Sequence, residues 1–341
     1  MDLQKKLPAI KLNQSLSCHT TFKIGGPAEY FYLAKTTDDL VKAITTARQF
    51  KLPFIVLGNG SNVLVADKGV RGLVIKNQTS QVKILDKPIP KIKSPSIPPR
   101  FKSLDKSLQP LAQLEYNESN YPAVLVEISS GATLPQVIFS LINQGITGLE
   151  WFAGIPATIG GATFINLHGG HKYFSDYLVT AKIFTADNQL KTVSAEYFQF
   201  AYDDSKLKTN QDIVLSVILR LYKGPKTKAL KIAKTWALKK SHQPQRSAGC
   251  IFQNLNKSDQ ARLKLPTPSI GYLMDKVLNL KGKTIGQAQI SSKHAGFITN
   301  LGQAKAADVV KLIKLMRQTA KKQLDLDLKL EIVPLGFTEE L

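Results

Sequence analysis

A glycine-rich stretch at residues 153–166, Ala-Gly-Ile-Pro-Ala-Thr-Ile-Gly-Gly-Ala-Thr-Phe-Ile-Asn, constrains the fold of this chain more than any other segment. Three glycines and one proline fall within the eight residues from Gly154 to Gly161. Missing side chains let a backbone approach a large flat group, and glycine permits positive φ, so that amide N–H groups can converge on an anion. An apolar run from Ala162 to Ile165 follows at once. The stretch predicts either a dinucleotide cradle or a glycine-rich turn between two core elements.

The composition is that of an ordinary globular protein. The 341 residues, 43% of them hydrophobic and 21% charged, suffice for two or three domains with substantial cores. No apolar run approaches the roughly 18–20 residues that span a bilayer. The first residues lack the apolar core of a secretory signal, and Cys18 and Cys250 are too few for a disulfide framework. We therefore expect a cytoplasmic protein.

The net charge of +21 is high for an enzyme and has three interpretations. Clustered lysines neutralise nucleic-acid phosphates, a basic surface attracts nucleotides and diphosphates, and a basic surface can simply be typical of a lineage. The lysines of this chain are spread along its length and are rarely interleaved with aromatic residues, unlike a base-stacking surface. We therefore expect neither a nucleic-acid partner nor a membrane partner.

The hydrophobic pattern predicts a mixture of short strands and helices. Helices are expected where apolar residues recur at helical spacing, at residues 37–50, 134–144, 270–277 and 304–323. Strands are expected at residues 22–24, 29–33, 54–57, 63–65, 123–128, 178–184, 213–221 and 328–333. A small-residue turn, Gly58-Asn-Gly-Ser-Asn62, separates two of these strands and is a second place where backbone N–H groups can bind an anion.

Residues 79–122 differ in character from the rest of the chain. Five prolines lie between Pro88 and Pro99, and seven lysines or arginines face two acids between Gln81 and Lys106. This composition predicts an extended, mobile, basic insertion, either solvated or in contact with a partner. A later basic stretch, residues 223–240, carries seven lysines and no acid and is expected to lead through a helix into another domain.

Several segments together resemble one family, MurB or UDP-N-acetylenolpyruvoylglucosamine reductase, a flavoenzyme of peptidoglycan precursor synthesis. The matching segments occur in family order and leave mainly the basic insertion uncovered. They are residues 19–28, 57–64, 153–166, 202–205, 247–254, 290–300 and 330–336. The spacing from Gly282 to Asn300 is more similar to the shorter type II branch of that family.

The resemblance implies an α+β fold: a two-lobed FAD-binding unit (PCMH/vanillyl-alcohol-oxidase-like) followed by an α+β substrate-binding domain. On this basis we expect a first FAD-binding lobe at residues 1–76 and a second at 77–224, with the insertion at 79–122. The substrate-binding domain would occupy residues 225–341. A monomer is expected.

The resemblance also implies the reaction. NADPH reduces bound FAD and departs, and the flavin hydride then passes to C3 of UDP-N-acetylglucosamine enolpyruvate while a proton reaches C2, giving UDP-N-acetylmuramate. Such an enzyme serves cell-wall biogenesis and hence cell shape and division, and its partners are a UDP-sugar and NADPH. Two alternatives stay open: another FAD-dependent oxidoreductase on the same scaffold, or a non-catalytic flavin or nucleotide-sugar binding protein.

Fourteen positions are implied to contact FAD, from the two glycine-rich segments and the segment before them. They are Thr21, Gly25, Gly58, Asn59, Gly60, Ser61, Asn62, Val63, Gly154, Ile155, Pro156, Gly160, Gly161 and Ala162. No metal site is expected, because the spacing of His168 and His171 alone is poor evidence for one.

Two residues are implied to be catalytic. Hydride addition at C3 leaves negative charge at C2 and on the neighbouring carboxylate, which needs electrophilic stabilisation and a proton donor. Glu331 lies in an apolar segment, where desolvation favours a protonated carboxyl that polarises the substrate carboxylate. Cys250 stands where most family members have a proton-donating serine, and a thiol is the stronger acid. The alternatives are a solvent-facing carboxylate and a buried, small apolar residue.

The substrate-binding residues implied by the resemblance are Tyr202, Lys240, Arg246, Asn254 and His294. Lys240 would face the UDP diphosphate, and His294 either contacts substrate or stabilises its own turn. The chain departs from the family at two positions, since Asp203 and Val333 stand where relatives have arginines. Arg246 is the candidate replacement cation because it lies close to Cys250 in sequence.

Overall fold

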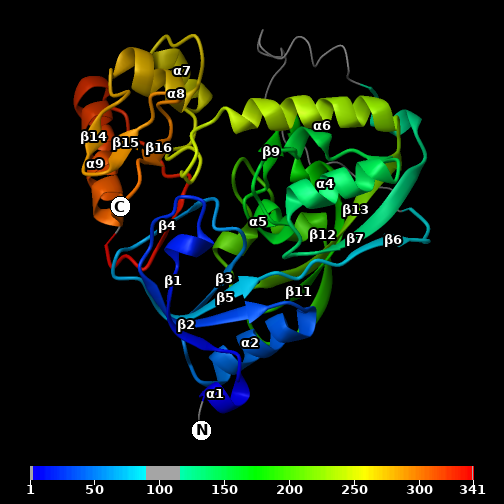
Figure 1. Ribbon diagram of the computed structural model, residues 1–341. Coiled ribbons are helices and arrows are strands. Elements are labelled where there is room, and N and C mark those ends of the chain that lie inside the picture. Colours follow the sequence, from blue (N-terminus) through cyan, green and yellow to red (C-terminus); the bar gives the residue numbers. More distant parts are fainter. Residues whose placement is uncertain (1–2, 90–115, 340) are drawn as a thin grey trace. The chain divides into compact units, whose positions relative to one another are not determined.

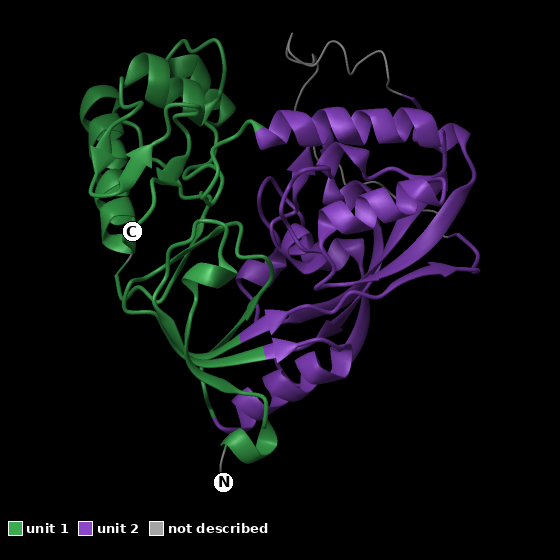
Figure 2. Cartoon of the chain, viewed as in Figure 1, with its two compact units in different colours: residues 1–32, 51–74, 242–341 green, residues 33–50, 75–241 purple. Residues whose placement is uncertain are grey.

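The computed structural model describes residues 3–89, 116–339 and 341 and divides into two compact units, coloured separately in Figure 2. Unit 1 joins residues 1–32, 51–74 and 242–341, and unit 2 joins residues 33–50 and 75–241. Among the described residues, no helix has both the length and the apolar character needed to cross a bilayer. The predicted three-domain division stays a prediction, although the contacts group residues 225–241 with unit 2.

Unit 1 combines the N-terminal strands with the C-terminal third of the chain. Its elements, labelled in Figure 1, are α1 (Leu3–Lys6), β1 (Lys11–Ser15), β2 (Pro27–Ala34), β3 (Phe54–Leu57), β4 (Val63–Val65), β5 (Val70–Asn77), α7 (Lys257–Arg262), α8 (Ile270–Tyr272) with a π-helical turn (Leu273–Val277), β14 (Thr284–Ile285), β15 (Ala288–Ile290), β16 (Ile298–Asn300), α9 (Ala306–Leu324) and β17 (Val333–Leu335). The last residues of β2 and β5 continue into unit 2.

Three sheets organise unit 1. β1, β2, β5 and β3 form one sheet in that order, β14, β15 and β16 form a small antiparallel sheet, and β17 pairs in parallel with β4. The core joins Phe22, Ile24 and Leu64 to residues of the C-terminal segment such as Phe252 and Met316. The N-terminal strands and the C-terminal segment therefore share one hydrophobic core.

Helix α9 is fixed at its N-terminus by an aspartate from a distant part of the chain. The two carboxylate oxygens of Asp67 accept hydrogen bonds from the backbone amides of Ala306 (2.7 Å) and Ala307 (2.9 Å). These amides have no acceptor within the helix, and the helix dipole favours a negative charge beside them. Asp67 follows β4 by two residues, so the contact links the helix to the β4–β17 pair.

We expect the Asp67→Ala variant to lose about 1–2 kcal/mol of unfolding free energy, because two amide donors lose their acceptor and a favourable charge. Asp67→Asn keeps one acceptor oxygen without the charge and should lose less. Urea unfolding followed by circular dichroism measures both differences. Equal losses in the two variants would show that neither the charge nor the second oxygen contributes.

Unit 2 is built on a larger antiparallel sheet with helices packed against it. Its elements are α2 (Thr37–Gln49), β6 (Val82–Leu85), β7 (Ala123–Ser129), α4 (Leu134–Asn143), β8 (Ile146–Thr147), α5 (Ile159–Phe164), β9 (His168–Gly169), β10 (Lys172–Tyr173), β11 (Leu178–Phe184), β12 (Leu190–Ser194), β13 (Ile213–Lys223) and α6 (Lys226–Ser241). The strand order is β12-β11-β13-β7-β6, and β8 also pairs with β13. Helix α5 packs against β7 and β13, and α4 packs against α6 (Figure 1).

A cluster of buried acids and tyrosines connects three segments of unit 2. The Tyr177 hydroxyl donates to Glu118 (3.0 Å), Lys172 forms an ion pair with the same carboxylate (3.4 Å), and the Tyr116 hydroxyl donates to buried Glu150. Burial raises the pKa of Glu118, and the Lys172 ammonium offsets part of that rise. The folded protein therefore holds a proton on Glu118 more tightly than the unfolded chain does.

The Glu118→Gln variant is expected to gain stability relative to the wild type as the pH rises. A folded-state pKa above the unfolded value means that the contribution of Glu118 is fully present below the unfolded pKa and is lost as pH rises through the folded one. Glutamine has no charge to bury at any pH. Unfolding free energies of both proteins at about pH 4 and about pH 8 measure the change. A difference that does not vary with pH, or varies in the opposite direction, would refute this assignment.

Most of the predicted elements are confirmed. The expected helix at 304–323 is α9, whose buried face includes Val309, Ile313, Met316 and Ala320. The expected helix at 134–144 is α4, and the expected strands at 178–184 and 213–221 are β11 and the first part of β13. These segments are long or strongly periodic, which makes the sequence signal clear.

Three expectations were wrong in part. Residues 22–24 form a turn in which Lys23 has a φ of 57° and both apolar neighbours are buried, so alternation there reflects a turn and not a strand. The strand expected at 328–333 is wrong in its bounds. The last strand is β17, and buried Leu326 and Leu328 lie outside any strand. The insertion is ordered at its start, where β6 pairs with β7; residues 90–115 lie outside the described residues.

Candidate active site

The turn at residues 58–63 closes against the segment that precedes β2. The Thr21 amide donates to the Gly60 carbonyl (3.1 Å). Gly60 has a φ of 65°, and a Cβ at this position would lie 2.4 Å from the His19 carbonyl oxygen. Only glycine therefore fits here without displacing the neighbouring backbone. Gly25 is similarly close, since a Cβ there would lie 2.8 Å from the Cβ of Val65.

This turn presents three backbone amides that have no acceptor elsewhere in the described part of the chain. They belong to Gly60, Ser61 and Asn62. Consecutive amides of this kind form a concave site for an anion such as a diphosphate. The chemistry of the turn therefore fits the phosphate groups of a dinucleotide.

Cys250 and Glu331 lie on two segments that pair with each other in unit 1. The Glu331 amide donates to the Ile251 carbonyl (2.9 Å), and Phe252 and Leu330 form a β-bridge. Both Cys250 and Glu331 are half-buried. The structure thus brings together the two residues predicted to be catalytic, which are 81 positions apart in the chain.

The glycine turn is hydrogen-bonded directly to the segment of Glu331, and Thr21 connects it to the backbone that precedes Cys250. The Thr21 hydroxyl donates to the Ser247 carbonyl (2.8 Å), three residues before Cys250. The Asn62 side chain donates to the carbonyl of Glu331 (3.2 Å), and the Val333 amide donates to the Asn62 carbonyl (2.9 Å). A group bound at this turn is therefore next to the backbone that carries the two predicted catalytic side chains.

Three predicted substrate-binding residues also lie in unit 1. Asn254 accepts the Ile270 amide through Oδ1 (3.0 Å), and His294 accepts the Gly296 amide through Nδ1 (3.1 Å). The His294 ring contacts Phe297, which forms a β-bridge with Cys250. The His294 side chain therefore bonds to the backbone that follows it, and both expectations for this residue stay predictions.

Arg246 is exposed and has a φ of 48°, and its carbonyl accepts the Asn300 amide (3.0 Å). Its backbone is therefore fixed directly before the Cys250 segment. Its guanidinium remains the candidate replacement cation of unit 1.

The glycine-rich loop at residues 153–166 lies in unit 2. The amides of Ile159, Gly160 and Ala162 donate to carbonyls of the protein itself, and Gly161 donates to the Thr158 hydroxyl (3.3 Å). These four amides are therefore not directed at an external anion, which corrects the expectation of converging amides here. What the loop offers is backbone with few side chains, the surface that a flat ring system can approach.

Gly154 links this loop to helix α6. It has a φ of 82°, and a Cβ at this position would lie 2.8 Å from the Ala237 Cα and 3.0 Å from the Lys240 Cβ. The Lys240 ammonium lies over the Trp236 ring, 5.3 Å from its centroid. The loop and the lysine predicted to face the diphosphate are therefore neighbours.

Tyr202 and Asp203, the residue that departs from the family pattern, lie beside the end of α5. The Asn166 side chain donates to the Ala201 carbonyl (3.0 Å). Asp203 is buried and pairs with Nδ1 of His168 (3.0 Å), and the His168 ring stacks on Tyr202 (5.5 Å between centroids). The acidic residue at the family's arginine position is therefore within hydrogen-bond distance of a histidine of the same unit.

Two hydrogen bonds of the site gave no recognisable signal in the sequence. Ser247, and the side chain of Asn62 that was expected as a contact to FAD, bond to partners more than two hundred residues away, and such pairings are invisible to local patterns. The His168–Asp203 pair had a weak signal, because Asp203 was a charge reversal that required a compensating partner.

The comparisons with known proteins agree with the motifs. A family model described as UDP-N-acetylenolpyruvoylglucosamine reductase, C-terminal domain (MurB_C), matches residues 241–335. The reductase of that name from Halalkalibacterium halodurans is 33% identical over 333 residues, covering 96% of this chain and 94% of the relative. The one from Agathobacter rectalis is 33% identical over 344 residues, covering 97% and 96%.

Solved structures extend the comparison to the fold. The crystal structure of UDP-N-acetylenolpyruvylglucosamine reductase (MurB) from Thermus caldophilus has a TM-score of 0.68 at 29% identity and covers 96% of this chain and 98% of its own. The predicted α+β fold class is confirmed by this likeness over nearly the whole length. The chain therefore belongs to the UDP-N-acetylenolpyruvoylglucosamine reductase family.

Proposed function

We propose that this chain reduces UDP-N-acetylglucosamine enolpyruvate to UDP-N-acetylmuramate, with FAD as cofactor, NADPH as electron source and Cys250 and Glu331 as catalytic residues. One observation carries the assignment of the site. The turn at 58–63, whose amides suit a diphosphate, is hydrogen-bonded to the segments of both residues through Thr21 and Asn62. Family membership supports the reaction, which belongs to peptidoglycan precursor synthesis.

The flavin contacts are proposed segment by segment. Gly58 to Val63, with Thr21 and Gly25, would hold the diphosphate and the adjoining part of the cofactor. The loop at 154–162 would cover a flat face of the ring system. FAD bound by these residues would supply the hydride chemistry that connects NADPH with C3 of the enolpyruvyl group. The residues of the chain bind and orient the two reactants and control the accompanying proton.

Cys250 is proposed to supply that proton to C2. The reaction adds one hydride at C3 and one proton at C2. The double bond between these two carbons thereby becomes a single bond. The thiol donates the S–H proton and is left as a thiolate, which regains a proton from solvent before the next turnover. Its half-buried position limits competing water without isolating the thiol from solvent.

Glu331 is proposed to stabilise the charge that hydride transfer places on the C2 side of the substrate. As a protonated carboxyl it donates a hydrogen bond to the substrate carboxylate, where the developing negative charge is delocalised. Its amide is fixed to Ile251, so the side chain starts from a rigid backbone position close to Cys250. Arg246 is proposed as the additional cation.

The remaining contacts are proposed to bind the nucleotide sugar. Lys240 would pair with the diphosphate, while Tyr202, Asn254 and His294 would contact the sugar or enolpyruvyl part. The boundaries at 76/77 and 224/225, a monomeric state and a cytoplasmic location belong to the same proposal. Light scattering after size-exclusion chromatography tests the monomer.

Anaerobic stopped-flow absorbance tests the reaction. The purified protein should contain FAD, lose the absorbance of oxidised flavin on mixing with NADPH, and regain it on mixing with the enolpyruvyl nucleotide but not with UDP-N-acetylglucosamine. Reduction without reoxidation by the enolpyruvyl nucleotide would favour another flavin-dependent oxidoreductase. A protein without flavin that binds only the nucleotide sugar would favour the non-catalytic alternative.

A further inference from the structure

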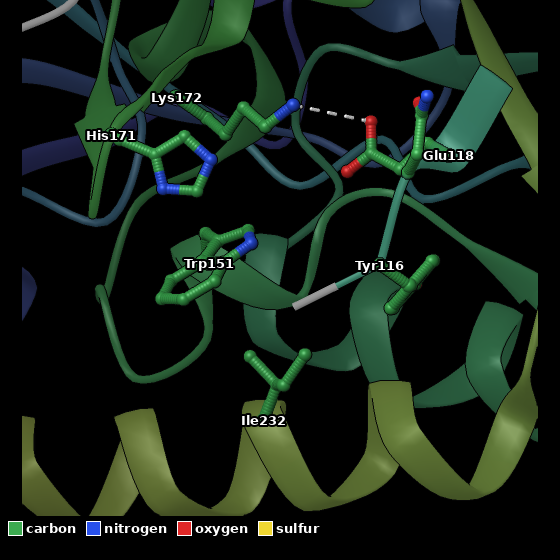
Figure 3. Close-up of a pocket in the computed structure, with 7 residues that line it drawn as sticks. Tyr116, Glu118, Trp151, His171, Lys172 and Ile232 are labelled. Carbon is green, nitrogen blue, oxygen red and sulfur yellow. Dashed lines mark hydrogen bonds and ion pairs between the residues drawn. The ribbon is translucent and has the colours of Figure 1, made fainter. Parts of the chain in front are cut away.

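Unit 2 contains a cavity of about 320 Å³. None of the residues assigned to FAD or to the substrate contributes to its walls. Its walls are built from the segment at 116–118, Trp151, the turn between β9 and β10, and helix α6. Figure 3 shows Lys172 reaching towards Glu118 on one side, with Ile232 projecting from α6 on the opposite side. The lining residues are Tyr116, Asn117, Glu118, Trp151, His171, Lys172 and Ile232.

The polar wall of this cavity holds an acceptor and a donor next to each other. The Lys172 ammonium lies 3.4 Å from one Glu118 oxygen, and Tyr177 donates to the other oxygen (3.0 Å). The side chains of Lys172 and Glu118 are 27% and 11% exposed, so both reach the cavity edge from a largely buried setting. The Asn117 side-chain oxygen accepts from Ser119, which leaves the amide nitrogen as a further donor.

The apolar wall is formed by Trp151 and Ile232, both deeply buried. Trp151 contacts the His171 ring edge-on, with 5.0 Å between centroids. Gly170 has a φ of 57°, and a Cβ at this position would lie 2.7 Å from the Trp151 ring. The β9–β10 turn is therefore pressed against Trp151, and this contact fixes His171 and Lys172 at the cavity.

This combination suits a sugar ring. Each hydroxyl of a vicinal diol donates one hydrogen bond and accepts others, so the pair can satisfy a carboxylate and an ammonium that lie side by side. The C–H face of the ring is apolar and would lie on the side that Trp151 closes, with Ile232 behind it. A purely apolar ligand would leave the polar pair without new partners, and a free anion would meet the Glu118 carboxylate. The cavity volume lies near the lower end for ligand sites, as a single ring requires.

We propose that this cavity, the Glu118–Lys172 pocket, binds a sugar ring through two adjacent hydroxyls. The ring is either a free hexose or the ribose of a nucleotide, since both carry a vicinal diol and an apolar face. The site is separate from the one proposed for reduction, because none of its lining residues is assigned to FAD or to the substrate.

Ligand-observed NMR titration of the FAD-loaded enzyme tests the proposal. The probes are methyl β-D-glucopyranoside and adenosine, each compared with its 2-deoxy or 2′-deoxy counterpart. We expect one probe to bind about tenfold more tightly than its deoxy counterpart, because the counterpart loses a hydroxyl that contacts a charged group. Discrimination only within the glucoside pair identifies a hexose site, and discrimination only within the adenosine pair identifies a ribose site. No binding, or no effect of the missing hydroxyl in either pair, would overturn the proposal.

Variants locate the binding. Glu118→Gln and Lys172→Met should each weaken it about tenfold while NADPH-dependent turnover stays unchanged. The matched control is Glu127→Gln, which breaks the Glu127–Lys182 pair (2.8 Å) on the sheet of the same unit and should leave binding intact. The chain has two tryptophans, Trp151 in the cavity wall and Trp236 in contact with it, so their emission gives an independent readout. Binding that persists in both pocket variants, or that weakens equally in the control, would place the ligand elsewhere.

Discussion

Replacing Cys250 by alanine is expected to slow the reoxidation of reduced flavin by the enolpyruvyl nucleotide about 10²–10⁴-fold. The first half-reaction, reduction by NADPH, should keep its rate, because no proton from the protein has to reach a substrate carbon in that step. The physical reason is that hydride arrival at C3 builds negative charge at C2, and removing the donor leaves only water to neutralise it. Anaerobic stopped-flow absorbance measures each half-reaction separately.

The chain offers two matched controls for this prediction. Cys250→Ser restores a proton-donating side chain of similar size and should recover most of the lost rate. Cys18→Ala removes the other cysteine, which is exposed and whose thiol donates to the Ser15 carbonyl (3.1 Å), and should leave both half-reactions unchanged. If Cys250→Ala kept both rates, the proton would come from another group. If it lost both, Cys250 would matter for structure or flavin binding.

Local patterns predicted the elements whose burial follows a regular period. Helices α9 and α4 each bury one face, so the spacing of their apolar residues was sufficient. The turn at 22–24 was missed because two buried apolar residues around one left-handed lysine produce the same alternation as a strand. Periodicity reports which residues are buried and does not report whether the backbone between them is extended.

The candidate site depended on relationships that no local pattern contains. Resemblance to a family pointed to Cys250 and Glu331, and the pairing of their segments through Ile251 supplied the geometry. The hydrogen bonds that join Asn62 to Glu331 and Thr21 to Ser247 span 269 and 226 residues, so they follow only from the tertiary fold.

The two glycine-rich segments differ in how their backbone amides are used. The loop at 154–162 was expected to offer amides to an anion, yet its amides from Ile159 to Ala162 are used within the protein. The turn at 58–63 has amides with no acceptor in the described part of the chain, at Gly60, Ser61 and Asn62. Glycine content predicts close backbone approach, whereas the hydrogen bonds that a segment already makes decide whether its amides are available to an anion.

Asp203 stands where relatives have an arginine, and the structure explains how this aspartate is accommodated. The explanation changes what the substitution implies for function. A buried aspartate next to a substrate carboxylate would repel it, but Asp203 is paired with His168 and its carbonyl accepts a hydrogen bond from Lys208. Both the carboxylate and the backbone carbonyl of Asp203 therefore have polar partners inside unit 2. The departure from the family pattern does not by itself argue for a different substrate.

The Gly60→Ala variant is expected to lose about 2–5 kcal/mol of unfolding free energy and to be purified with little FAD. A positive φ costs an alanine about 1–2 kcal/mol, and overpacking of its methyl group adds about 1–3 kcal/mol. The overlap is severe because the methyl carbon would lie 2.4 Å from the His19 carbonyl oxygen and 3.0 Å from the Thr20 Cα. Relief requires the turn to move away from Thr21, which displaces the amides proposed to hold the diphosphate.

Gly282→Ala separates the two contributions. Gly282 also has a positive φ, 80°, but a Cβ there meets no atom within 4 Å among the described residues, so only the backbone cost of about 1–2 kcal/mol should appear. Its flavin content should equal that of the wild type. Unfolding in urea, measured on flavin-free protein, gives the stability difference, and the ratio of flavin to protein absorbance gives the occupancy. Equal destabilisation of the two variants would show that the contact with His19 costs nothing. Full flavin occupancy in Gly60→Ala would show that the turn does not hold the cofactor, because the overlap leaves its amides no undisturbed position.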